Sequence, residues 1–178
     1  MRVDGRITIS NAPTGSAGTD FLLRDAATGK VGFDFAEVFP TSEDVQAGEV
    51  LVIDEANPGT LKKATQAYDE NVIGVASASP ALTFEGDQIH IAPQENKFTS
   101  GNKPPVALAG RVLCKVSTEN GAIEPGDLLT TSSVPGHAMR ATDPDKTFDA
   151  VVGKALESFG GGPNGETLGK IYILVTVQ

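Results

Sequence analysis

Two histidines and one cysteine are the side chains of this 178-residue chain with the widest catalytic and metal-binding repertoire. His90 lies in a segment that alternates polar and apolar residues, and His137 directly follows a Pro-Gly turn. Neither has a second ligand at the spacing of a zinc site, so we expect both on the surface or at a strand edge. Cys114 has a valine two residues away on either side, which predicts a small buried core residue rather than an activated nucleophile.

Asp127, Ser132, Ser133 and His137 are close enough in the sequence to suggest a hydrolytic cluster. A serine nucleophile needs a base that is itself oriented and a strained turn that exposes the hydroxyl. The segment shows neither feature, because Asp127 completes a Pro-Gly-Asp turn and the two serines belong to a polar strand. We therefore expect no catalytic residues here and no enzymatic activity.

Three loops resemble binding sites only superficially. Residues 160–165 are glycine-rich, but they lead into a predicted strand and lack the lysine of a phosphate-binding loop, so we expect a simple turn. Residues 143–145 and 69–71 are the nearest candidates for calcium, which requires several oxygens from one short loop. Solvated surface charge explains both better, and the sequence predicts no metal ligand and no cofactor.

The composition excludes several broad classes of protein. Fourteen Lys and Arg against 23 Asp and Glu give a net charge of −9, which disfavours nucleic acid and anionic membranes as partners. No apolar run approaches the roughly 18 residues of a membrane-spanning helix, so we expect no membrane insertion. A single cysteine rules out an internal disulfide framework.

Short aliphatic runs separated by glycine and proline predict an all-β fold. Clear examples are residues 50–53, 71–75, 112–116 and 171–177. The last of these is apolar on both faces, which predicts a strand buried on both sides. The strongest helix signal falls within residues 35–47, where we expect no more than about one turn.

An internal repeat relates residues 45–76 to residues 123–155 at an offset of 77 to 79 residues. Each copy begins with an apolar residue, two spacers, Gly, an acid and two aliphatics, and a further strand follows each copy. Two such units can bury their apolar faces together, so we expect a compact barrel or sandwich built from two pseudo-repeated β units. The first copy carries a polar insertion at residues 77–105, which we expect on the surface.

Residues 1–40 differ from the rest. A Gly/Ser/Thr/Pro linker separates a short strand at 6–9 from a hairpin expected between 21 and 33. We interpret residues 1–40 as an extended arm and hairpin that packs on another element or subunit, and residues 41–178 as the β domain.

Six segments of the repeat region form a recognisable set: NVIGV (71–75), VALAGRV (106–112), KVSTENG (115–121), IEPGDLLT (123–130), PGHAMRA (135–141) and VGKALE (152–157). Together they resemble a β-rich domain of phage tail-fibre, spike and neck-appendage proteins, over about residues 45–178. The resemblance implies a homotrimeric virion or appendage component. In some members of this family the related region is an intramolecular chaperone that cleaves itself off at a Ser–Asp bond. This sequence contains no Ser-Asp dipeptide, so we expect an uncleaved chain.

The leading hypothesis is therefore a structural virion protein, assembled in the host cytoplasm: a fibre, spike or capsid-decoration subunit. It would associate with itself and dock on a capsid or tail protein through residues 1–40, with a host surface receptor as a further partner. One alternative is a self-processing chaperone or peptidase domain. Another is a module that binds a host glycan or receptor, although the chain has no Trp for stacking and only two tyrosines, Tyr68 and Tyr172.

Overall fold

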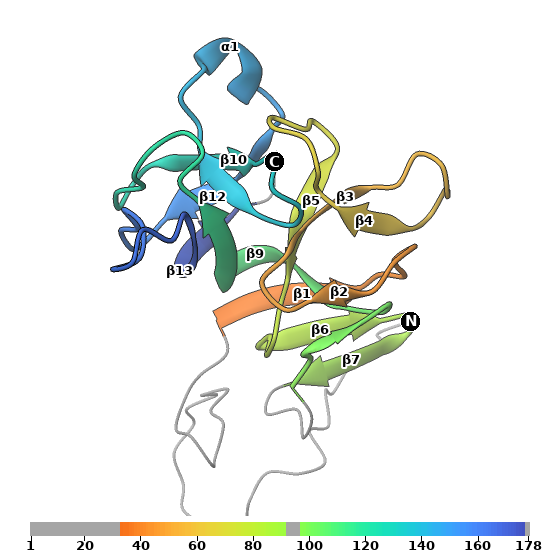
Figure 1. Ribbon diagram of the computed structural model, residues 1–178. Helices are drawn as coiled ribbons and strands as arrows, with labels where there is room; N and C mark the ends of the chain where they lie inside the picture. The colour runs from red at the N-terminus through yellow and green to blue at the C-terminus, as the bar shows by residue number, and fades with distance from the viewer. Residues whose placement is uncertain (1–32, 92–96, 177–178) are drawn as a thin grey trace, which may run out of the picture.

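The computed structural model describes residues 33–91 and 97–176, and nearly all regular structure in them is β (Figure 1). The only helix in these ranges is the single turn α1 (Pro144–Thr147). The all-β prediction is confirmed. The strands are β1 (Phe33–Val38), β2 (Val45–Gln46), β3 (Val50–Ile53), β4 (Leu61–Lys63), β5 (Val72–Ala76), β6 (Leu82–Glu85), β7 (Gln88–Ile91), β8 (Ser100–Gly101), β9 (Pro105–Ser117), β10 (Leu128–Thr131), β11 (Ala138–Arg140), β12 (Val151–Ala155) and β13 (Leu168–Val175).

A five-stranded mixed barrel forms the centre of the fold, in the order β11-β10-β12-β13-β9. The neighbours along this path are antiparallel, and a parallel pairing of Ala138 with Val116 closes β11 onto β9. The 13-residue strand β9 also extends beyond the barrel. There it pairs with β5, which carries β3 and β4, and with β1, which carries β6 and β7. In Figure 1 the β1-β6-β7 extension lies below the barrel strands.

The two copies of the sequence repeat form equivalent strands, with β3, β4 and β5 matching β10, β11 and β12. The pairing register shifts after Leu51 in the first copy and after Leu129 in the second. The acidic residue of each turn accepts a hydrogen bond from the backbone three residues earlier. The Gln46 N–H donates to Glu49 at 2.8 Å, and the Glu124 N–H donates to Asp127 at 2.9 Å. The repeat in the sequence is therefore a repeat in backbone geometry.

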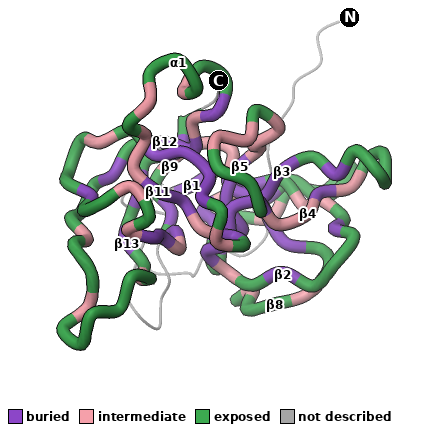
Figure 2. The backbone as a smooth tube through the Cα atoms, turned by 45° about the horizontal axis from the view of Figure 1, so that its top comes forward, coloured by how far each residue is buried: buried purple, intermediate pink, exposed green. Residues whose placement is uncertain are grey.

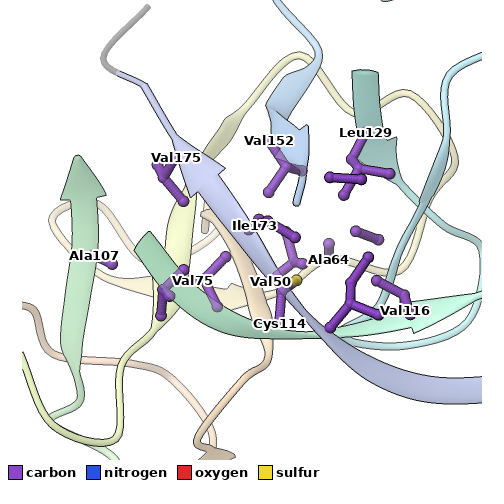
Figure 3. Close-up of a cluster of buried hydrophobic side chains, with 14 of the residues drawn as sticks. Val50, Ala64, Val75, Ala107, Cys114, Val116, Leu129, Val152, Ile173 and Val175 are labelled. Carbon is purple, nitrogen blue, oxygen red and sulfur yellow. The ribbon is translucent and has the colours of Figure 1, made fainter. Parts of the chain in front are cut away.

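The main core fills the barrel and continues under β3 and β5 (Figure 3). Inward side chains of β9 and β13 alternate with outward ones, as the burial pattern of β13 shows. Cys114 is fully buried among these inward residues, as predicted. Figure 2 shows the buried stretches following the strands, with exposed segments concentrated in the connections. A second, smaller cluster packs around Leu51 and Val106 on the other side of β3 and β9.

The helical turn expected within residues 35–47 is wrong. Residues 33–38 form β1, and in it buried Asp34 and Ala36 alternate with exposed Phe35 and Glu37. The period of two fits a strand, and hydrogen bonding to β9 stabilises it, which the local helix signals could not reveal. The hairpin expected between 21 and 33 lies outside the described residues except for its last residue, Phe33.

Candidate functional site

Large apolar side chains lie exposed in two rows across the β1-β6-β7 extension. Strand pairing aligns Phe35 with Leu82 and Ile91, and the second row continues from Glu37 to Phe84 and Ile89. Paired residues share a face of the sheet, so both rows belong to one surface. Ile89 is 61% exposed and Phe35 54%. We call this surface the extension face: Phe35, Glu37, Leu82, Phe84, Ile89 and Ile91.

A second apolar surface covers the outside of the barrel. Leu113 pairs with Tyr172 across β9 and β13, and both side chains are exposed. Register also links Arg111, Leu174, Lys154 and Leu128 in one row across four strands. We call this surface the barrel face: Arg111, Leu113, Leu128, Lys154, Leu156, Lys170, Tyr172 and Leu174.

Strand β13 explains why the barrel face is apolar. Ile171, Ile173 and Val175 point into the core, and the intervening Tyr172 and Leu174 point out. The sequence predicted burial on both sides of this strand. Within one chain that prediction is wrong for the outer side, because Tyr172 is 41% exposed and Leu174 38%. The apolar outer half of β13 was thus the sequence signal for this surface.

A polar hollow of about 390 Å³ lies against the other side of β6 and β7. Thr83, Glu85 and His90 line it, together with Lys97 and Lys103 from the segment before β9. The His90 Nε2 atom is 3.3 Å from a Glu85 carboxylate oxygen, without the alignment of a hydrogen bond. Because the side chain is 40% exposed, His90 is a surface residue, as predicted.

The four residues of the suspected hydrolytic cluster make their hydrogen bonds elsewhere. Ser132 and Ser133 each donate a hydroxyl hydrogen bond to Glu119 at 2.6 Å. His137 Nδ1 lies 2.8 Å from the carbonyl oxygen of Pro135, within its own turn. Asp127 caps the Glu124 N–H, as described above. These contacts hold loops in place, and they do not align a nucleophile with a base.

Glu119 accepts the hydrogen bonds of both serines, and the sequence did not suggest it as a site residue. Partial burial alone would raise the pKa of its carboxyl group, but the hydrogen bonds from Ser132 and Ser133 lower it overall. The Ser132 hydroxyl also lies 2.9 Å from that of Ser117 on β9. The carboxylate therefore joins the turn after β10 to the end of β9.

The remaining candidate loops are also held by internal contacts. Asp143 caps α1 and pairs with Lys146 at 3.0 Å, and Asp69 accepts the N–H of Asn71 at 3.0 Å. In the glycine-rich loop the Gly162 N–H donates to the Glu166 carbonyl at 2.8 Å. Burial raises the pKa of the Cys114 thiol to about 12, so it stays protonated. Among the residues that the structure describes, no three His, Cys, Asp or Glu side chains could hold a metal ion together.

Tyr68 forms a polar junction between the two copies of the repeat, which the sequence did not predict. Its phenolic oxygen accepts hydrogen bonds from the Thr142 N–H at 2.9 Å, the Asp143 N–H at 3.1 Å and the Asn120 amide at 3.1 Å. Burial alone would raise the pKa of the phenol, but the hydrogen bonds from Thr142 and Asp143 lower it overall. Tyr68 lies more than 50 residues from each partner in sequence, so no local pattern could reveal the junction.

The described part of the chain contains no helix with the length and apolar character needed to cross a membrane. Comparison with protein families, with curated proteins and with solved structures finds no match for this chain.

Proposed function

We propose that the chain is a structural virion protein: a fibre, spike or capsid-decoration subunit that associates with copies of itself. In this proposal the β domain, which includes β1, supplies the contacts between subunits, and the part of residues 1–40 that precedes β1 docks on a capsid or tail protein. The closed assembly is a homotrimer, as the resemblance of residues 45–178 to phage fibre and appendage domains implies.

The observation that carries self-association is the exposed apolar face of β13. The hydrophobic contribution of an apolar strand comes from the surface that it removes from water, at about 25 cal/mol per Å². The inward side chains of β13 make that gain in the barrel core, whereas Tyr172, Leu174 and the paired Leu113 each keep about 40% of their surface exposed to solvent. Contiguous apolar patches rimmed by polar residues typically mark sites of protein–protein contact.

Solution mass is the direct test of this proposal. Light scattering on the purified full chain, with intact mass spectrometry on the same sample, should give three times the mass of an uncleaved chain. A monomer at the highest concentration the protein reaches would overturn self-association. A shortened chain would instead support the self-processing alternative.

A further inference from the structure

We propose that copies of this chain associate head to tail, with the extension face of one copy packed on the barrel face of the next. This inference rests on the proposed self-association and adds which surfaces meet. The partner of each extension face is therefore the barrel face of another copy of the same chain.

Both faces have the anatomy of an interface between subunits. Each has exposed aromatic or aliphatic side chains at its centre, Phe35, Phe84 and Ile89 on one and Leu113, Tyr172 and Leu174 on the other. Aromatic and aliphatic anchors of this kind dominate the energetics of stable interfaces. Charged side chains lie beside them, where a rim is expected.

The charges on the two faces are opposite. The extension face carries Glu37 within its apolar rows, and exposed Asp87 lies in the β6–β7 turn, whereas Glu85 lines the polar hollow on the other side of these strands. The barrel face carries three exposed cations, which are Arg111, Lys154 and Lys170.

An acid also lies beside the barrel face. Glu157 is exposed, and its carboxylate accepts the Tyr172 N–H at 2.8 Å. Among the side chains that define the two faces, the barrel face carries three cations and no acid, whereas the extension face carries Glu37 and no cation.

Charge decides between two modes of packing. In an isologous contact each face would meet its own copy, so an acidic extension face would meet a second acidic face, or a basic barrel face a second basic face. Like charges in a partly desolvated contact are destabilising, and the net charge of −9 already makes copies repel at a distance. Packing of the extension face on the barrel face brings opposite charges together instead.

The fold allows each copy to use both faces at once. The extension is built on β1, which pairs with the first half of β9, and the barrel face is built on the second half of β9 with β13. The two faces adjoin along β9, where Phe33 pairs with Arg111 and Phe35 with Ala109, but they consist of different side chains and can contact two different copies. Heterologous contacts of this kind close into rings or continue as filaments, and the proposed homotrimer is the closed case.

Complementation between two variants of the full chain tests this arrangement. Ile89→Glu places a charge on the extension face, and Tyr172→Glu places one on the barrel face. We expect each variant alone to be a folded monomer, with association weakened at least about tenfold. An equimolar mixture should form a 1:1 complex, because one intact extension face and one intact barrel face remain.

Phe148→Ser is the matched control. Phe148 is 80% exposed and follows α1, which lies apart from β13 and from the β1-β6-β7 extension in Figure 1, so its loss should leave the oligomer unchanged. Far-UV circular dichroism and thermal unfolding of each variant establish that it is folded before its mass is interpreted.

The contrary outcomes separate the two proposals. A monomeric wild-type chain would overturn self-association itself. A wild-type oligomer that survives Ile89→Glu or Tyr172→Glu would leave self-association standing and overturn the assignment of these faces. Two monomeric variants that do not combine would overturn head-to-tail packing in favour of an isologous contact.

Discussion

Gly74 and Gly153 occupy equivalent positions in the two copies of the repeat, and each lies against a carbonyl oxygen of the neighbouring strand. A Cβ atom on Gly74 would overlap the carbonyl oxygen of Ala107, and one on Gly153 would overlap that of Leu174. Neither glycine has a positive φ, so close approach of the backbones, and not chain conformation, requires the missing side chain.

We expect Gly153→Ala to destabilise the fold by about 2–4 kcal/mol, because the new methyl group must displace the backbone of β13. Urea denaturation should show a lower midpoint with an unchanged slope. Gly160→Ala is the matched control, since a Cβ there would meet only the Ala122 side chain at 3.8 Å. Equal effects of the two substitutions would contradict this packing argument.

Asp34 makes stability depend on pH. Its side chain is buried, one carboxylate oxygen has no hydrogen-bond partner among the described residues, and burial raises the pKa of the group to about 6. The unfolded chain loses this proton near pH 4 and the folded chain only near pH 6. Stability therefore falls as the pH rises through this window, by about 3 kcal/mol in total.

Asp34→Asn removes this titration. The free energy of unfolding of the variant, relative to that of wild type, should rise by about 3 kcal/mol from about pH 4 to pH 7. Denaturation at both pH values measures this change. Asp87→Asn, in the exposed β6–β7 turn, controls for the loss of one negative charge. If the free energies of unfolding of Asp34→Asn and wild type differed by the same amount at every pH in this range, Asp34 would not titrate as described.

Lys115 and Glu49 form an ion pair at 2.8 Å, with only 13% and 8% of their side chains exposed. Lys115→Met should cost about 3 kcal/mol, because it leaves the Glu49 carboxylate buried without its cation. Adding Glu49→Gln to that variant should recover part of the loss, for a coupling energy of about 1–3 kcal/mol in a double-mutant cycle.

The more exposed pair Lys63–Glu43, at 3.0 Å with side chains 25% and 42% exposed, provides the comparison. Its coupling should stay below about 1 kcal/mol because solvent screens it. If the two cycles gave the same coupling, burial would not be what strengthens the Lys115–Glu49 pair.

Tyr68→Phe tests the junction between the two copies. The change removes the acceptor of the Thr142 and Asp143 N–H groups, which should cost about 1–2 kcal/mol and speed exchange of these two amides with solvent. Tyr172→Phe, on the exposed barrel face, should change monomer stability by less than about 0.5 kcal/mol. Unchanged exchange at residues 142 and 143 would show that the phenol does not hold this loop.

The sequence predicted the all-β fold because the repeat and the short aliphatic runs are local patterns. The two acidic turns at Glu49 and Asp127 recur at matching positions, so the repeat is recognisable from the order of residue types alone. Two such units imply a shared core, and the choice of a barrel followed from the pairing of β11 with β9. That pairing joins residues distant in sequence, and no periodicity encodes it.

Local signals also gave a wrong prediction in the segment that follows β1. The Thr41-Ser42-Glu43 sequence is typical of a helix start, yet Thr41 donates its hydroxyl to the Glu43 carbonyl in a turn. The sequence could predict only part of the candidate site. The apolar outer side of β13 indicated the barrel face, but the rows of the extension face depend on the parallel pairing of β1 with β6. Tertiary contacts outweighed the local helix propensity of residues 41–43. Pairing between strands also determined the rows of the extension face, which local patterns do not encode.

Residues 77–105 follow the last strand of the first copy, and no segment of similar content follows the second. Two identical units joined in one chain would be interchangeable, and any surface on one would recur on the other. The β6–β7 hairpin belongs to the first unit alone, so the two units of the subunit present different surfaces. If the proposed contact is correct, this loss of internal equivalence is what lets identical subunits be added in a defined orientation.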